Sequence, residues 1–176
     1  NYTFIEGDSG LILFDTGLNN GAGTEILKMK EAFSDKPIIA IIYTHHHYTA
    51  GSQAIAAHYP EYDMPIYGHP DVDKNLFSVF SYTAAGSFRR GNIQFGHFLP
   101  KEGPDAAYGI AEPVFDDPSL NARGHLPVTH PVKDGEEVTI DGVKLVFHHA
   151  IADTEDSLII HFPDLDAVVH NTAVMP

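Results

Sequence analysis

The chain contains no cysteine. Disulfide bonds, thiolate nucleophiles and cysteine-type zinc sites are therefore excluded, and any metal ion must be held by histidine or carboxylate side chains. No apolar run approaches the roughly 20 residues that a membrane helix needs, so we expect a soluble protein without membrane insertion. The cytoplasm and the periplasm both remain open as its compartment.

Basic residues are scarce. The 10 Lys and Arg residues face 24 Asp and Glu residues, which gives a formal net charge of −14. Such a surface repels nucleic acid and anionic membranes, so neither is expected as a partner. A length of 176 residues fits one hydrophobic core. We therefore expect residues 1–176 to form a single domain.

The apolar pattern predicts strands that alternate with helices. Residues 37–43 form a nearly continuous apolar run, as in a strand that is buried on both faces. This alternation indicates a layered α/β domain. Residues 91–131 are rich in Gly, Pro and Asp and predict a long loop on the substrate side of a site. Further strands are expected at residues 2–6, 11–14, 64–67, 137–140, 143–148, 158–162 and 167–170, and helices at residues 23–33, 50–58 and 72–90.

Three adjacent histidines, His45, His46 and His47, follow the buried strand at residues 37–43. Two histidines that leave a strand in the pattern His-x-His can aim at one point, while the residue between them faces away. His45 and His47 are thus candidate metal ligands, with His46 turned elsewhere. A cluster of histidines with ordinary hydrogen bonds is the alternative interpretation.

At this point the sequence resembles the metallo-β-lactamase fold. The resemblance lies in Asp-Thr-Gly at residues 15–17, in Thr-His-x-His at residues 44–47 and in the later strand, loop and strand. Ala-Gly followed by paired arginines at residues 85–90 is similar to the alkylsulfatase branch. The resemblance implies a four-layer αββα sandwich. Because the family's last histidine would lie beyond Pro176, it also implies truncation at the C-terminus.

The resemblance implies a site for two metal ions, but a departure from the family pattern leaves ligands for only one. Members continue with an Asp-His pair that builds the second site, whereas Thr49 and Ala50 stand here. Alignment of the third motif places Asp153 as a ligand, with Glu155 as the competing choice. Two histidines and one carboxylate with an open position are typical of catalytic zinc, and also suit iron or manganese. We therefore expect one divalent metal, with zinc favoured.

Other candidate site residues are less specific. Asp153, Tyr48 and His170 are the candidates for catalytic roles. The resemblance implies that Arg89 and Arg90 hold a sulfate group through forked hydrogen bonds. Two basic residues that interact with the dipole at a helix end are an equally weighted alternative for the arginines.

Two functions are carried forward. The first is a metal-dependent hydrolase that resembles alkylsulfatases and uses metal-activated water on an anionic small molecule such as an alkyl sulfate. The second is a catalytically inactive protein of the same fold that binds a metal or an anionic ligand. The missing Asp-His pair supports the second hypothesis. Assembly as a homodimer is left open.

Overall fold

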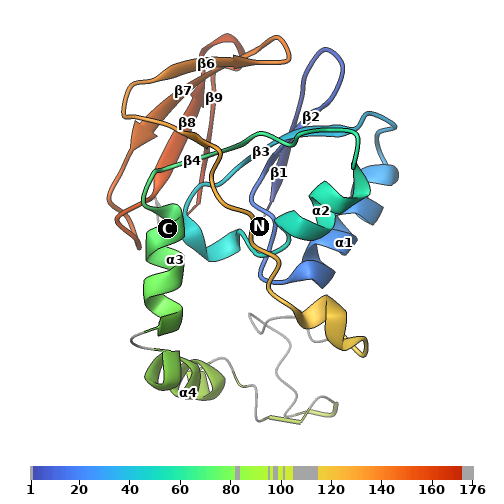
Figure 1. Ribbon diagram of the computed structural model, residues 1–176, viewed down its shortest axis with the longest axis vertical. Coiled ribbons are helices and arrows are strands. Elements are labelled where there is room, and N and C mark those ends of the chain that lie inside the picture. The colour runs from blue at the N-terminus through green and yellow to red at the C-terminus, as the bar shows by residue number, and fades with distance from the viewer. Residues whose placement is uncertain are drawn as a thin grey trace.

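The computed structural model describes most of the chain. The described ranges are residues 2–81, 84–94, 96, 99–100, 102–104 and 115–171. They form two β-sheets, with helices beside and below them (Figure 1).

Five strands form the first sheet, in the order in which they occur along the chain. The first two pair antiparallel, and each later strand pairs parallel with the one before it. β2 and β3 are apolar and almost wholly buried, as the sequence predicts for the centre of such a sheet. The strands are β1 (Thr3–Glu6), β2 (Leu11–Phe14), β3 (Ile38–Ile42), β4 (Ile66–Gly68) and β5 (His130–Pro131).

Helices α1 (Asn20–Glu31) and α2 (Ser52–His58) lie against the outer face of the first sheet. The Asn19 side chain caps α1 by accepting a hydrogen bond from the Ala22 backbone N–H. A Cβ atom at Gly51 would lie 2.1 Å from the Thr16 carbonyl oxygen, so only glycine allows the chain to pass there. This close approach packs the start of α2 onto the residues that follow β2.

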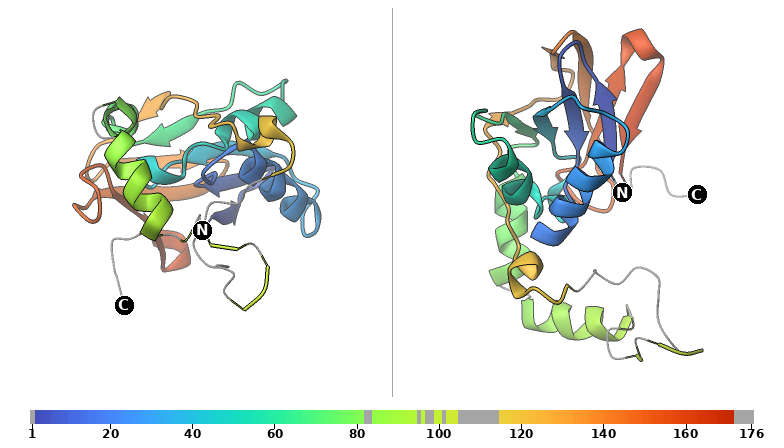
Figure 2. Two further views of the ribbon diagram at one scale, coloured as in Figure 1. Left: turned by 90° about the horizontal axis from the view of Figure 1, so that it is seen from below. Right: turned by 90° about the vertical axis from the view of Figure 1, so that its right-hand side faces the viewer.

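The second sheet packs on the other face of the first, with aromatic side chains such as Phe14 and Phe147 between them. All its pairings are antiparallel, and the turn at Asp141 and Gly142 has positive φ at both residues, as a tight hairpin requires. No described helix packs on its outer face (Figure 2). Its strands are β6 (Glu137–Ile140), β7 (Val143–His149), β8 (Leu158–Phe162) and β9 (Ala167–His170).

The long helix expected at residues 72–90 is wrong in detail. The structure has two helices, α3 (Val72–Ser81) and α4 (Ala84–Gln94), and α4 lies beyond α3, away from the sheets (Figure 1). The apolar stripe of α3 does not continue into α4, since Leu76 is buried whereas Phe88 is exposed. None of the helices in the described ranges is long and apolar enough to cross a membrane.

Part of the loop expected at residues 91–131 falls outside the described residues, namely 95, 97–98, 101 and 105–114. The part after residue 115 runs along the N-terminal ends of α1 and α2. The Asn20 N–H donates to the Ala122 carbonyl at 2.9 Å, and the Gln53 N–H donates to the Gly124 carbonyl at 2.8 Å. This segment then enters β5, which the sequence did not predict.

Candidate metal centre

The candidate site lies where β3 ends and the loop between β7 and β8 comes alongside. The Leu158 N–H donates to the Thr44 carbonyl at 2.8 Å, which ties the start of β8 to the end of the first sheet. His45 is still extended, with φ of −171°, and the chain then turns through the short 3-10 helix η1 (His46–Tyr48). That turn brings the His45 and His47 rings to a centroid distance of 4.9 Å.

Three ligand atoms converge at this turn. His45 Nε2 lies 3.1 Å from His47 Nδ1, and Asp153 Oδ2 lies 3.8 Å from the first nitrogen and 3.3 Å from the second. Ligands on a tetrahedral zinc ion with bonds of about 2 Å are roughly 3.3 Å apart, so the spacing and the donor types fit a metal ion. Within the described residues this is the one group of three or more such side chains that lies close enough to hold an ion.

A chain of buried hydrogen bonds orients His45. The Thr44 N–H and hydroxyl donate to the two carboxylate oxygens of Asp15, at 2.9 and 2.7 Å. The Thr44 oxygen is then left to accept from His45 Nδ1 at 3.0 Å. A proton on Nδ1 leaves the lone pair of Nε2 pointing at His47 and Asp153, as a metal ligand needs. Asn171, directly after β9, also donates to Asp15, at 3.1 Å.

Burial sets the charge of this group. It lowers the pKa of His45 to about 4, with a further contribution from His47, and it also lowers the pKa of His47. Both imidazoles are therefore neutral at pH 7, which is the form that binds metals. Burial has the opposite effect on Asp15, whose pKa it raises to about 6 against the hydrogen bonds from Thr44.

His46 turns away from the ligand atoms, as the alternation predicts. Its Nδ1 lies 2.9 Å from Oδ1 of the fully buried Asp156, and the same oxygen accepts from Asn75 Nδ2 at 3.0 Å. Burial alone would raise the pKa of Asp156, but the hydrogen bonds from His46 and Asn75 outweigh it and hold that pKa below its ordinary value. Asp156 is therefore a carboxylate that accepts from two different segments.

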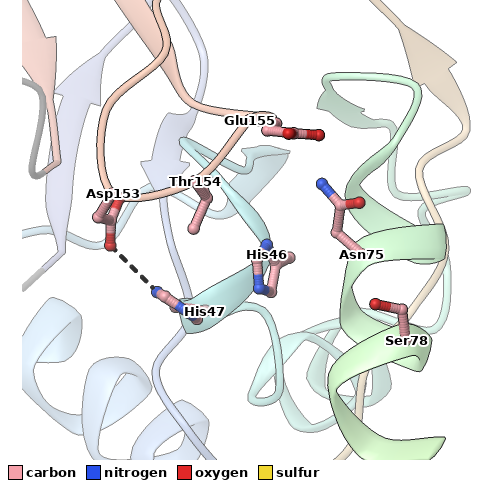
Figure 3. A pocket seen from close by; sticks show the side chains of 7 residues that line it. All are labelled: His46, His47, Asn75, Ser78, Asp153, Thr154 and Glu155. Atoms are coloured by element: carbon pink, nitrogen blue, oxygen red, sulfur yellow. Dashed lines mark ion pairs between the residues drawn. The ribbon is translucent and has the colours of Figure 1, made fainter. Parts of the chain in front are cut away.

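A pocket of about 300 Å³ opens beside the ligand group (Figure 3). Asp153 and His47 face each other on one side of it, whereas Glu155 lies across the pocket, near Asn75. Glu155 is exposed and lies outside the converging group, so the geometry favours Asp153 over Glu155 as the third ligand. All the lining residues carry polar side chains: His46, His47, Asn75, Ser78, Asp153, Thr154 and Glu155.

The remaining predicted residues lie further out. The Tyr48 ring meets the edge of His45 at a centroid distance of 5.4 Å, and burial raises the pKa of its phenol. His170 is exposed on β9, and because Val169 packs into the core, alternation turns His170 to the opposite face. Arg89 and Arg90 are exposed on α4 and are not among the residues that line the pocket. The structure does not bring His170 or the two arginines to the ligand group.

Comparison with known proteins identifies the family. The family model of the metallo-beta-lactamase superfamily matches residues 1–170. The chain belongs to this superfamily. The fold agrees, because the chain superposes on the crystal structure of a metallo-beta-lactamase family protein from Thermus thermophilus with a TM-score of 0.61, at 15% identity over 97% of this chain and 53% of that one.

Within the superfamily, the chain is similar to alkylsulfatases. It is 27% identical over 164 residues to a linear primary-alkylsulfatase of Pseudomonas sp. (strain ATCC 19151). The matched stretch covers 91% of this chain and 30% of that protein. An (R)-specific secondary-alkylsulfatase of Pseudomonas sp. is 26% identical over 98% of this chain and 26% of its own length. The solved stereoselective inverting sec-alkylsulfatase Pisa1 from Pseudomonas sp. has a TM-score of 0.72 at 24% identity, over 93% of this chain and 27% of that one.

The predicted resemblance and the metallo-β-lactamase fold class are thus confirmed. The described residues place no helix on the outer face of the second sheet, where the predicted four-layer sandwich would have its second helical layer. The chain spans less than a third of the length of the curated relatives that it matches. In this metallo-beta-lactamase superfamily member, Thr49 and Ala50 are buried beside the ligand turn, where the Thr49 hydroxyl donates to the His46 carbonyl at 3.3 Å. Neither side chain is a metal ligand, so both support packing of the turn instead.

Two residues of the site were not singled out from the sequence. Thr44 was predicted only as part of a motif, although its hydroxyl links Asp15 to His45. Asp156 has no role in the sequence-based interpretation, although it lies in the same acidic stretch as Asp153 and Glu155. A signal did exist for Thr44, because a hydroxyl next to a ligand histidine is well placed to bond its free ring nitrogen. No local pattern marks Asp156, since its burial depends on how the loop folds.

Proposed function

We propose that the chain carries the metal site of a metal-dependent hydrolase, in which His45, His47 and Asp153 hold one divalent cation. The supporting observation is that ligand atoms from two separate loops lie within 3.1 to 3.8 Å of one another. Two imidazoles and one carboxylate form a set that zinc commonly occupies in catalytic sites with an open position. Iron and manganese accept the same donors, so zinc is favoured by donor chemistry alone.

Each residue of the site has its own part in this proposal. A divalent cation in such a set supplies Lewis acidity and activates water near neutral pH. His45 is kept neutral by burial and is turned by Thr44 so that Nε2 faces the ligand group. Tyr48 packs against the edge of His45 and, as a phenol whose pKa burial raises, is a hydrogen-bond donor at neutral pH.

The proposed substrate is a sulfate ester. Support for it comes from the alkylsulfatase relatives rather than from the pocket. The described residues that line the pocket include Asp153 and Glu155 but neither Lys nor Arg. A sulfate group would therefore meet no lysine or arginine side chain among them. The residues that line the pocket thus give no support to the roles that the sequence suggested for Arg89, Arg90 and His170.

Metal analysis and turnover test the proposal together. The purified chain is expected to contain one divalent metal per chain, and His45→Ala is expected to lose it. Hydrolysis of a long-chain alkyl sulfate should stop with a chelator and return with added zinc. Lys144→Ala is a suitable control, since Lys144 lies on β7 and pairs with the exposed Glu137. Absence of stoichiometric metal in the wild type, with no binding of added zinc, would overturn the proposal.

A second candidate function is metal binding without turnover. It is favoured by Thr49 and Ala50, which replace the Asp-His pair that the resemblance implies for a second metal. The same experiment separates the two candidates. Stoichiometric metal with no hydrolysis of alkyl sulfates or carboxylic esters supports binding alone, whereas chelator-sensitive hydrolysis supports the enzyme.

A further inference from the structure

The third ligand of the proposed site lies on a loop with little burial of its own. Residues 150–157 connect β7 to β8, and the loop is closed by the Ala150 N–H donating to the Ser157 carbonyl at 3.0 Å. The Asp153 side chain is 34% exposed, and Ile151 is 79% exposed. A loop of this kind loses conformational entropy when its carboxylate must stay at one position. Something beyond closure of the loop has to hold Asp153 beside the histidines.

Asp156 joins that loop to two other segments. It is fully buried, and its Oδ1 accepts from His46 Nδ1 at 2.9 Å and from Asn75 Nδ2 at 3.0 Å. His46 is the residue between the two histidine ligands, and Asn75 projects from α3 at the side of the pocket (Figure 3). One carboxylate oxygen therefore connects the loop of Asp153, the turn of His45 and His47, and α3.

We propose that Asp156 is a positioning residue of the metal site. By accepting hydrogen bonds from His46 and Asn75, it fixes the loop of Asp153 against the histidine turn and thereby sets the affinity for the metal ion. This inference rests on the proposed site at His45, His47 and Asp153. Groups that hold ligands in place without touching the metal typically change metal affinity by about 10- to 100-fold when they are removed.

A purely stabilising role accounts less well for this arrangement. Buried ion pairs often contribute little net stability, because desolvation offsets the attraction. The other ring nitrogen of His46, Nε2, and the other carboxylate oxygen of Asp156, Oδ2, are also buried and have no hydrogen-bond partner among the described residues. The pair therefore keeps two uncompensated polar atoms. Its position between the two ligand-bearing segments is the feature that distinguishes it.

The chain contains a matched pair for control experiments. His125 Nε2 lies 2.8 Å from Asp73 Oδ1, so α3 is tied to another segment by the same kind of contact. Neither residue belongs to the converging ligand group or lines the pocket. Asp73→Ala should therefore lower the melting temperature of the metal-free protein without changing its affinity for metal.

The test uses the full chain as wild type, Asp156→Ala, Asp156→Asn and Asp73→Ala. The zinc Kd is measured by competition with a chromophoric chelator, the visible spectrum is recorded with cobalt, and the melting temperature is taken without metal. Asp156→Ala should weaken zinc binding by about 10- to 100-fold and change the cobalt spectrum. Asp156→Asn keeps an oxygen that accepts from His46 and Asn75, so it should restore most of the affinity.

The outcomes separate this inference from the proposed function. A wild type that binds no zinc overturns the proposed metal site and this inference with it. A wild type that binds zinc, with an unchanged Kd in Asp156→Ala, overturns the positioning role alone. An equal loss of affinity in Asp73→Ala also overturns it, because general destabilisation then explains the effect. If Asp156→Ala does not fold, Asn75→Ala takes its place and should give an intermediate loss of affinity, and an unchanged Kd overturns the inference.

Discussion

The turn that carries His45 and the helix that carries Arg89 are built in opposite ways. His45 is fully buried and fixed through Thr44 by the buried Asp15, so the first sheet determines its position. Helix α4 has no buried residue, and Arg89 and Arg90 are exposed on it. The core of this fold therefore determines where a metal can bind. The arginines that the sequence suggested for substrate binding lie on a part that the core does not fix.

Removal of the two histidine ligands should show this contrast most strongly. His45→Ala and His47→Ala should each weaken zinc binding more than about 100-fold. This loss exceeds the one expected when a residue that only holds a ligand in place is removed. Only His45→Ala should also lower the free energy of unfolding of the metal-free protein substantially, by roughly 2 to 4 kcal/mol, because it leaves a buried cavity. The His47 side chain is 45% exposed, so its loss should cost little.

Denaturant unfolding with a chelator present, together with chelator competition, measures both quantities. Phe147→Leu is a control in the inter-sheet core and should change stability but not affinity. Equal destabilisation by the two histidine variants would contradict the prediction, because it would mean that the core does not hold His45 more firmly than His47.

The choice of third ligand sharpens the comparison within one loop. Asp153→Ala should reduce zinc affinity strongly, whereas Glu155→Ala should leave it within about threefold of the wild type, since exposed charges interact weakly with distant groups. Asp153 Oδ2 lies 3.3 Å from His47 Nδ1, while Glu155 is outside the ligand group. Zinc titration of both variants measures the effect, and the reverse ranking would transfer the ligand role to Glu155.

Asp15 provides a pH-dependent test of the buried half of the site. Burial raises its pKa from 3.8 in the unfolded chain to about 6 in the folded protein. The folded protein thus holds a proton that the unfolded chain releases, so stability from Asp15 is present below about pH 4 and is lost as the pH rises through 6. Relative to Asp15→Asn, the metal-free wild type should lose about 3 kcal/mol of unfolding free energy between pH 4 and 7.

Asn is a suitable replacement, because Asp15 has a φ of 60° and Asn tolerates that left-handed backbone better than most residues. The free energy of unfolding is measured in urea at several pH values, with a chelator present. Parallel pH profiles for the wild type and the variant would show that folding does not raise the pKa of Asp15.

The features that the sequence predicts are those set by local pattern, whereas features set by distant contacts are missed. The apolar run of β3 and the histidines after it predict a strand and a ligand turn, because both depend on local pattern. The sequence predicted Asp153 as a ligand with Glu155 as the competing choice and gave Asp156 no role, since residues 150–157 contain three acidic residues and no periodicity. Contacts with His46, 110 positions earlier in the sequence, and with Asn75 on α3 distinguish the buried Asp156. The break between α3 and α4 was also missed, because both segments contain residues that favour helix.

Substitution of the exposed arginines on α4 should have the smallest effects. The double variant Arg89→Ala and Arg90→Ala should change the free energy of unfolding by less than about 0.5 kcal/mol, as is usual for surface substitutions. Since neither arginine lines the pocket, zinc affinity should be unchanged, and KM for an alkyl sulfate should stay within about twofold. Measurement at low and high salt would detect any long-range attraction, which salt screens. A large, salt-sensitive rise in KM with unchanged kcat would instead return the arginines to the substrate site, and α4 would then have to approach the pocket when substrate binds.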